Sequence, residues 1–353
     1  MTRAGDAKAT PRVLIAGDWR WDHYEAALES GLIALGCNVV RFCELPVPTG
    51  PIESYLARLR LGPAIARVRA DFLETCRRST PDLVLLYACD VIDRSTIGEL
   101  RRLVPGVTVF AYHNDNPYTG ARRRVIWRHY LGTIPELDGV FVYRPGNVSD
   151  ALGRGAPFAE VLLPSYMTSR HRPFENASSG PDVVYIGHFE PDGRAEVLEA
   201  IAATGLEVEL YGTRWDEAPA SCAWIRTQTV EPLTGEAYAR KLSDARIGLV
   251  FLSAHNSDVW TRRCFEIPAC GTLMLAPRSA PLEAIFRDGI EAVYYDDAAS
   301  AAQLAVRYSD DGSSREAIAS AGRSLCVAEH SEVQRAEQIL QAFRRHVGGG
   351  EGG

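Results

Sequence analysis

Short apolar runs alternate with longer amphipathic segments along almost all of the 353 residues. Arg12–Gly17 is an apolar run without polar alternation, and Tyr24–Gly36 then shows helical spacing of its apolar residues before a glycine. Continuous apolar runs predict strands that are covered on both faces. Strands separated by helical segments predict parallel βαβ units. We therefore expect an α/β protein built on parallel sheets.

This rhythm pauses once. The segment Ser165–Asp182 is polar, contains two prolines and lacks periodicity, so it predicts an interdomain linker. The alternation then restarts at Val183–Gly187. We expect two Rossmann-like domains that face each other across a cleft, residues 1–170 and 171–330. Residues 331–353 are expected to form a helix that packs back toward the first domain, followed by a disordered tail.

Further segments fit the same scheme on both sides of the linker. Strands are expected at residues 38–44, 82–88, 107–113, 138–144, 159–165, 207–212, 247–252, 272–276 and 292–295, and helices at 52–78, 94–103, 194–205 and 238–245. Ligands of open α/β sheets bind at the carboxyl ends of the strands. Neither domain has Gly-x-Gly-x-x-Gly after its first strand, which argues against a dinucleotide-dependent dehydrogenase.

Composition excludes several classes of protein. The net charge of −7 argues against a broad nucleic-acid surface. The eight cysteines include no Cys-x-x-Cys pair, which gives no support to a zinc or redox motif and favours a reducing, cytoplasmic compartment. We expect no signal peptide and no integral membrane segment, because no run reaches the roughly 20 apolar residues of a membrane helix.

The stretch Asp258–Pro277 carries charges where the flanking sequence is typical of a protein core. If residues 259–270 are helical, then Asp258, Arg262 and Glu266 are spaced by four residues and share one polar face. One interpretation is a ladder of ion pairs on a solvent-exposed helix, each pair contributing about 0.2–0.5 kcal/mol. The other is a nucleotide site, in which the carboxylates accept hydrogen bonds from sugar hydroxyls and the arginine faces a diphosphate.

The end of this stretch has its own signals. Pro268 is expected to kink or shorten the helix, and Gly271 permits the tight return into the next strand.

The motif "TRRCFEIPACGTLMLAP" resembles the C-terminal domain of CgeB-like (spore-maturation type) glycosyltransferases of the GT-B fold. Residues 280–297, 161–174 and 183–201 resemble further parts of that family. The resemblance covers most of residues 160–300, whereas residues 12–160 match it only in rhythm. It implies a metal-independent, retaining glycosyltransferase whose nucleoside-diphosphate sugar is a substrate, so that no cofactor is expected.

The resemblance also assigns roles to residues of the donor domain. Glu266 is expected to hold the ribose diol, and Asp258 the hydroxyls of the donor sugar, although the family usually has Glu at the first position. Such families place an arginine directly after the glycine of the first donor-domain strand. Here Gly187 is followed by His188, a departure from that pattern, while Arg194 keeps the positive charge. Cations at this place stabilise the charge that develops on the leaving diphosphate.

A base pocket is expected after the second donor-domain strand. Gly212 and Trp215 follow that strand, and an aromatic face stacks well on a base. The alternative is that Trp215 packs onto its own domain. No Asp-x-Asp metal motif occurs in a matching context, so no metal site is expected.

The acceptor domain gives weaker signals. His23 follows the first strand and is a candidate general base, with Asp18 or Asp22 as its partner. The alternative is a structural histidine at a helix start. His113 and Asp115 are expected to line the acceptor cleft, unless residues 114–117 only form a turn. The basic segment 121–129 either recruits an acidic acceptor or forms a solvated helix face.

The leading hypothesis is a glycosyltransferase whose acceptor is a small molecule, a glycan or a protein. A nucleotide-sugar epimerase or hydrolase on the same fold is the second hypothesis, and a non-catalytic nucleotide-sugar-binding protein is the third. The departures at His188 and Asp258 favour the third hypothesis, and analysis of the products formed without acceptor separates the first two.

Overall fold

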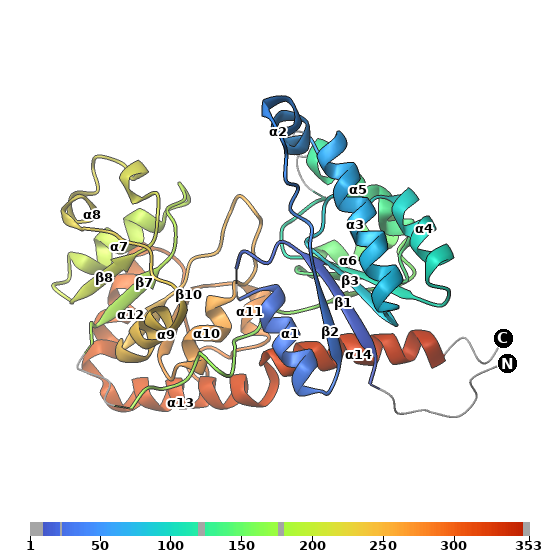
Figure 1. Cartoon of the computed structure of the whole chain (residues 1–353). Coiled ribbons are helices and arrows are strands. Elements are labelled where there is room, and N and C mark those ends of the chain that lie inside the picture. The colour runs from blue at the N-terminus through green and yellow to red at the C-terminus, as the bar shows by residue number, and fades with distance from the viewer. Residues whose placement is uncertain (1–9, 22, 119–123, 176–179, 349–353) are drawn as a thin grey trace. The chain divides into compact units, whose positions relative to one another are not determined.

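The computed structural model describes residues 10–21, 23–118, 124–175 and 180–348. The chain divides into two compact units. Unit 1 contains Met1–Leu163 and Glu332–Gly353, and unit 2 contains Pro164–Ser331 (Figure 1).

Unit 1 is built on a six-stranded sheet in the order β2-β1-β3-β4-β5-β6, in which all neighbouring strands run parallel. Its strands are β1 (Arg12–Gly17), β2 (Asn38–Cys43), β3 (Leu83–Tyr87), β4 (Thr108–His113), β5 (Gly139–Val142) and β6 (Ala159–Val161). Its helices are α1 (Glu25–Ala34), α2 (Pro51–Arg58), α3 (Pro63–Ser79), α4 (Arg94–Leu103), α5 (Arg124–Thr133), the short η1 (Ile134–Glu136), α6 (Gly146–Gly153) and α14 (Glu332–Gly348).

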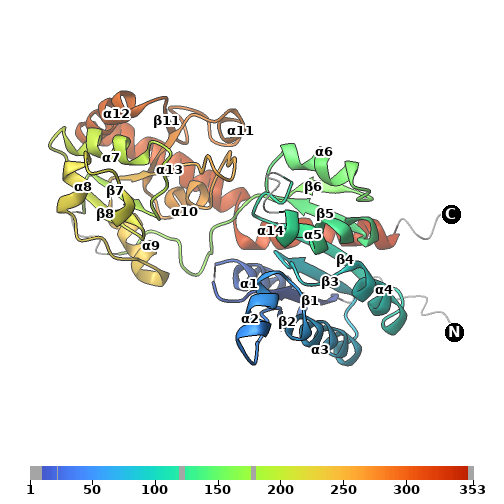
Figure 2. The ribbon, with the colours of Figure 1, turned by 90° about the horizontal axis from the view of Figure 1, so that it is seen from above.

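Helices cover both faces of this sheet, as its apolar strands require. Leu14 and Ala16 of β1 belong to a core that also contains the inner residues of α3 and α4. On the opposite face, α14 packs against α1 (Figure 2). The ring of His346 on α14 meets the ring of Phe110 on β4. Gly31 of α1 is needed there, because a Cβ would lie 2.3 Å from the carbonyl oxygen of Glu332.

Unit 2 has a five-stranded parallel sheet in the order β11-β10-β9-β7-β8. Its strands are β7 (Val183–Ile186), β8 (Val208–Tyr211), β9 (Ile247–Leu249), β10 (Leu273–Pro277) and β11 (Val293–Tyr295). Its helices are α7 (Arg194–Ala202), η2 (Trp215–Glu217), α8 (Ala223–Thr227), α9 (Gly235–Asp244), α10 (Arg263–Ala269), α11 (Ala280–Glu283), α12 (Ala298–Asp310) and α13 (Gly312–Glu329).

One face of the unit 2 sheet packs against α7 and α12, which share a core with β7 and β9. Helix α10 covers β9 closely, since a Cβ on Gly248 would lie 2.6 Å from Ile267. The chain thus contains two parallel sheets with helices on both faces of each. This is the expected α/β class with two Rossmann-like domains.

The division of the chain differs from the expected boundary at residue 170 and falls after Leu163. The reason is that residues 166–171 pack within unit 2. Tyr166 pairs with Ser331, and its N–H donates to the carbonyl of His330 at 3.3 Å. The expected helix 52–78 is two helices, because Gly62 has a φ of +85° and Pro63 then starts α3.

Across the described parts of the chain, every helix is too short or too polar to span a lipid bilayer.

Candidate functional site

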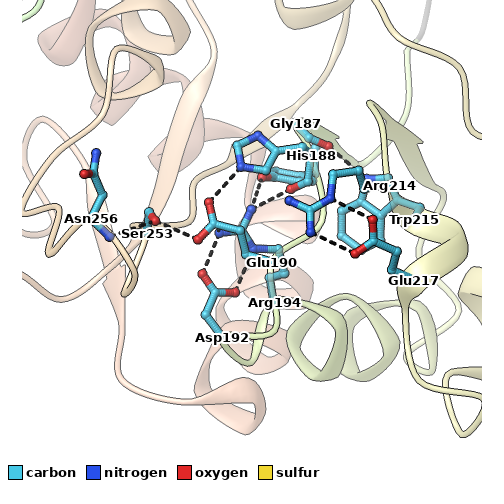
Figure 3. Close-up of polar contacts among 11 residues, drawn as sticks. Gly187, His188, Glu190, Asp192, Arg194, Arg214, Trp215, Glu217, Ser253 and Asn256 are labelled. Carbon is cyan, nitrogen blue, oxygen red and sulfur yellow. Dashed lines mark hydrogen bonds and ion pairs between the residues drawn. The ribbon is translucent and has the colours of Figure 1, made fainter. Parts of the chain in front are cut away.

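The carboxyl ends of β7 and β9 form the most organised polar region of unit 2. These adjacent strands mark the point where the strand order reverses, since the chain leaves β7 toward β8 on one side and β9 toward β10 on the other. Open α/β sheets bind ligands at such switch points. The turn after β7 (residues 187–193), the loop after β8 and the loop after β9 (residues 250–262) meet here (Figure 3).

Two glycines allow the turns after β7 and β8 to touch. Gly212 has a φ of +140°, and a Cβ on it would lie 1.8 Å from the carbonyl oxygen of Gly187. The N–H of Phe189 donates to the carbonyl of Thr213 at 2.9 Å, which continues the pairing beyond the strands. Only glycine tolerates both this backbone conformation and this contact.

Trp215 is part of the core and does not present a stacking surface. It is 4% exposed, and its indole N–H donates to the carbonyl of Gly187 at 2.8 Å. Its ring packs edge-on against Tyr185 and Phe189. The expectation that Trp215 frames a base pocket is therefore wrong, and the alternative that it packs onto its own domain holds. Its role is to fix the turn after β7.

His188, Glu190 and Ser253 connect the turn after β7 to the loop after β9. The Nε2 atom of His188 lies 2.7 Å from Glu190 Oε1, and the Ser253 hydroxyl donates to Glu190 Oε2 at 2.6 Å. Burial alone would raise the pKa of Glu190. The hydrogen bonds from Ser253 and His188, together with the charge of Arg194, hold this pKa below its ordinary value. Glu190 is therefore a fixed negative charge.

Arg194 is buried beneath this turn. Its guanidinium donates to Asp192 at 2.7 Å and 2.5 Å, to the carbonyl of His188 at 2.6 Å and to the hydroxyl of Tyr185 at 3.2 Å. Burial tends to lower the pKa of Arg194, but the bond to Asp192 and nearby charges raise it. The sequence predicted that Arg194 faces a diphosphate. The structure corrects this prediction, because the donors of Arg194 are directed into the turn and shape it.

Arg263 is the cation that sequence reasoning missed. It is the first residue of α10, and its Nε donates to the carbonyl of Ile186 at the end of β7. Its Nη2 lies 2.9 Å from the position that a Cβ on Gly187 would take. The signal was present as the second arginine of the "TRR" motif, but the expected helix placed Arg262 on the polar face instead.

The polar face predicted for residues 258, 262 and 266 does not form. Helix α10 begins only at Arg263, and the residues before it are a loop in which Ser257 has a φ of +54°. The N–H of Asp258 donates to the carbonyl of Ser253 at 2.9 Å, which holds the loop as a turn. Asp258 is therefore not on the helix that carries Glu266.

Glu266 is buried within an ionic cluster. Its Oε2 accepts from the hydroxyl of Tyr238 at 2.6 Å, and its Oε1 accepts from Arg262 at 3.1 Å and lies 3.7 Å from His171 Nε2. Burial would raise the pKa of Glu266, but the charge of Arg262 and the other contacts hold it far below its ordinary range. The predicted Arg262–Glu266 ion pair exists, though buried rather than exposed.

The ribose role of Glu266 stays a prediction. Both of its oxygens already accept hydrogen bonds, so a ribose hydroxyl would share the carboxylate with Tyr238 and Arg262. Gly271 has the expected left-handed conformation, with a φ of +84°, and its N–H donates to the carbonyl of Pro268 at 2.9 Å, which ends α10 before β10.

His113 and Asp115 lie at the carboxyl edge of the unit 1 sheet. His113 is 4% exposed, and its Nδ1 accepts from the backbone N–H of Asp115 at 3.2 Å. Its Nε2 therefore carries the proton and faces Asp90 Oδ1 at 3.3 Å. The expectation that His113 lines a cleft is wrong, because it is a buried group that orients Asp90. Asp115 is half-buried in the turn.

Glu44 and Asp90 were not expected from the sequence. Glu44 follows β2, Asp90 follows β3, and Glu44 Oε2 accepts from the N–H of Asp90 at 3.0 Å. Arg60 approaches Asp90 Oδ2 at 3.3 Å. Burial and the charge of Asp90 raise the pKa of Glu44 to about 8, so Glu44 is largely protonated at neutral pH.

The turn after β1 contains the remaining candidates. Asp18 binds Arg20, whose Nε lies 2.6 Å from Oδ1, so its carboxylate is occupied by that arginine. His23 packs edge-on against Tyr24, with ring centroids 4.4 Å apart. Asp22 lies outside the described residues, as does part of the basic segment 121–129. The buried carboxylate in this turn is Glu25, which accepts from the N–H of Asp18 at 2.8 Å.

Comparisons with known proteins agree with this architecture. Residues 194–341 match a family model described as glycosyl transferase-like. No curated protein matches the chain. The Anabaena HepE structure in complex with UDP-glucose superposes with a TM-score of 0.64 at 10% identity, covering 94% of this chain and 99% of HepE.

Two further solved structures share the fold. Sucrose-phosphate synthase from Thermosynechococcus elongatus gives a TM-score of 0.65 at 16% identity, covering 96% of this chain and 100% of the synthase. A glycosyltransferase from Rickettsia africae gives a TM-score of 0.66 at 9% identity, covering 95% and 98%. At these identities the structures show the fold, which is GT-B.

The protein is a glycosyltransferase of the GT-B type. The similar solved structures confirm the predicted fold, and the glycosyl transferase-like region together with them confirms the predicted enzyme class. In the GT-B protein that region begins at Arg194, the first residue of α7, and includes Arg263 and Glu266.

Proposed function

We propose that the protein transfers a sugar from a nucleoside-diphosphate sugar and that unit 2 binds this donor at the ends of β7 and β9. The observation that carries the proposal is the guanidinium of Arg263 beside Gly187, 2.9 Å from a Cβ position. The glycine there lets the guanidinium lie close to the backbone, and arginine donors match the geometry of phosphate oxygens. The UDP-glucose complex of HepE supports testing UDP-glucose first.

The chemistry of transfer requires stabilisation of the leaving nucleoside diphosphate. Arg263 and His188 lie at the mouth of the turn after β7 and supply donors for that charge. We therefore propose a metal-independent reaction. Asp258 and Glu266 keep the spacing that favours retention of the anomeric configuration, which is the finer part of the resemblance to CgeB-like enzymes.

The acceptor is assigned to unit 1. Asp90 is the ionisable group best placed to accept a hydrogen bond from an acceptor hydroxyl there, because it lies at the carboxyl edge of the sheet and is oriented by His113 and Arg60. The acceptor is a hydroxylated small molecule, glycan or protein.

Donor binding can be tested with a thermal-shift panel of nucleoside diphosphates on the full chain. A ligand at 100 times its Kd adds about 2.7 kcal/mol of stability. We expect wild type to respond to UDP, R263Q to lose most of the response, and R263K to keep part of it. The control is R287Q, which removes an exposed arginine of unit 2 that pairs with Glu291. An undiminished response of R263Q would contradict the proposed phosphate contact.

Turnover is tested by incubating UDP-glucose with and without candidate hydroxyl acceptors and analysing the sugar products. Transfer to an acceptor supports the proposal. Free glucose or an altered sugar formed without acceptor indicates a hydrolase or epimerase. Binding with no turnover under any condition indicates a non-catalytic nucleotide-sugar-binding protein.

A further inference from the structure

His188 lies at the candidate donor site, and its exposed side chain can be reached by a ligand. Its side chain is 50% exposed, and its Nε2 is held 2.7 Å from Glu190. Its other ring nitrogen, Nδ1, makes no hydrogen bond to any residue that the structure describes. The residue follows Gly187 directly, at the end of β7, where the turn is fixed by Trp215 (Figure 3).

A histidine at this position has different physical properties from an arginine. The guanidinium of arginine stays charged throughout the physiological range. The imidazole of histidine gains or loses its charge between about pH 5 and 8. A phosphate contact made by histidine is therefore sensitive to pH, and a contact made by arginine at the same place is not.

The charged groups around His188 are mostly paired with one another. Within its own turn, Glu190 accepts from the ring, whereas Asp192 and Arg194 are paired with each other at 2.5 Å. From the loop after β8, Arg214 and Glu217 pair with each other at 2.8 Å. Their pairing leaves Glu190 as the charge that acts most directly on the ring.

The remaining neighbours complete this arrangement. From the loop after β9, the neutral Ser253 holds the far oxygen of Glu190 at 2.6 Å. From α10, Arg263 approaches Gly187 and adds a positive charge on the ligand side. Glu190 is kept ionised by these contacts, since its pKa lies below the ordinary value despite burial.

We propose that His188 binds the diphosphate of the donor as an imidazolium, with Nε2–H held by Glu190 and Nδ1–H donated to a phosphate oxygen. The inference rests on the proposed function, because it assumes that the donor binds at this turn. It makes donor binding proton-coupled, so that the protein takes up a proton when a nucleoside-diphosphate sugar binds to the neutral histidine.

The direction of the pH dependence follows from linkage. Binding of the anionic diphosphate raises the pKa of His188 relative to the free protein, so the affinity is highest below the free pKa. The affinity then falls as the pH rises through the free and the bound pKa values. We expect the Kd for UDP-glucose to rise about tenfold between pH 6 and pH 8.5, which corresponds to a bound pKa about one unit higher.

The experiment titrates the full chain with UDP-glucose by calorimetry from pH 6 to pH 8.5. The diphosphate of UDP-glucose is esterified at both ends and keeps its charge over this range. UDP does not, because its terminal phosphate titrates near pH 6. The variants are H188Q, H188R and E190Q, and the control is H346Q, which removes a histidine of α14 that is 40% exposed and lies in unit 1.

We expect wild type and H346Q to show the same tenfold dependence, and H188Q to bind weakly with no such dependence. H188R should bind without pH dependence and more tightly than wild type at pH 8.5, while E190Q should lose affinity at a lower pH than wild type. Measurements in two buffers of different ionisation enthalpy should show proton uptake in wild type only. If wild type binds UDP-glucose and H188Q keeps the same pH dependence, the inference is wrong. If wild type does not bind at any pH, the proposed function itself fails.

Discussion

The first five strands of the two units have the same order, yet the pKa values of acids in the two units are shifted in opposite directions. In unit 1, burial raises the pKa of Glu25 and of Glu44, the latter to about 8. In unit 2, Glu266 is buried and Glu190 is half-buried, but their pKa values lie below the ordinary value. The same fold therefore shifts the pKa values of these carboxyl groups upward in one unit and downward in the other.

The residue that starts the helix after the first strand also differs between the two units. In unit 1 that residue is Glu25, whose carboxylate turns back and accepts the N–H of Asp18. In unit 2 it is Arg194, whose guanidinium turns back onto the carbonyl of His188 and onto Asp192. Both turns contain carboxylates, but the turn of unit 2 also contains Arg194 and lies beside Arg263, and these cations attract an anion. The comparison thus favours unit 2 as the site of the anionic donor.

The largest expected effect comes from removing the charge of Glu266. E266Q leaves Arg262 and His171 buried without their anion, and breaking such a buried pair costs about 3–5 kcal/mol. Urea denaturation of the full chain measures the loss in the transition of unit 2. The matched control is E236Q on α9, an exposed glutamate paired with Arg240, which we expect to change stability by less than about 0.5 kcal/mol. Equal stabilities of the two variants would remove the electrostatic contrast between the units.

The second effect is a pH dependence of the free energy of unfolding, which has opposite signs for Glu44 in unit 1 and Glu266 in unit 2. A carboxyl group with a raised pKa binds its proton more tightly in the folded state. The contribution of Glu44 is therefore fully present below pH 4.5 and is lost as the pH rises to about 8, by on the order of 5 kcal/mol. E44Q should remove this part of the slope in denaturation measured from pH 4.5 to 8.5. For Glu266, whose pKa is lowered, stability is instead lost as the pH falls below 4.5. An unchanged slope in E44Q would show that Glu44 is ionised in the folded protein.

The third effect concerns the backbone contact between Gly212 and Gly187 in unit 2. G212A places a Cβ 1.8 Å from the carbonyl oxygen of Gly187, and we expect a loss of about 2 kcal/mol and at least a tenfold weaker binding of UDP. G205A is the matched control, because Gly205 also has a positive φ, +87°, but has nothing within 4 Å of the added Cβ. If both variants bind UDP equally well, the contact between the two turns does not shape the donor site.

The smallest effect is expected from W215F. It removes one hydrogen bond to the carbonyl of Gly187 and should cost about 1 kcal/mol of stability. Because the indole is 4% exposed, we expect the affinities for UDP, ADP and GDP to change by less than about threefold. A large loss for one base alone would indicate that Trp215 does contact the base, as the sequence first suggested.

Periodicity predicted the fold because buried parallel strands are continuous apolar runs. The range expected for the first strand, Arg12–Gly17, is the range observed, and helix α4 also matches. Helix α10 was expected four residues too early, because the four-residue spacing of Asp258, Arg262 and Glu266 suggested a longer helix. The turn that Asp258 forms with Ser253 overrides that spacing. Contacts distant in the sequence decide such boundaries.

The candidate site was predictable only where a motif carries it. His188 and Gly187 were identified because they follow a strand directly. Glu44 and Asp90 meet only because β2 and β3 flank β1, and no spacing in the sequence announces such a pair. Trp215 was misread because a loop has no periodicity that separates a buried aromatic residue from an exposed one.

The most direct test of the central claim is hydrogen exchange of the full chain with and without UDP. The account predicts that UDP slows exchange most in the loops of unit 2, residues 186–194, 211–217 and 250–263. Slowed exchange in residues 17–25 and 88–91 of unit 1, with the loops of unit 2 unchanged, would contradict it.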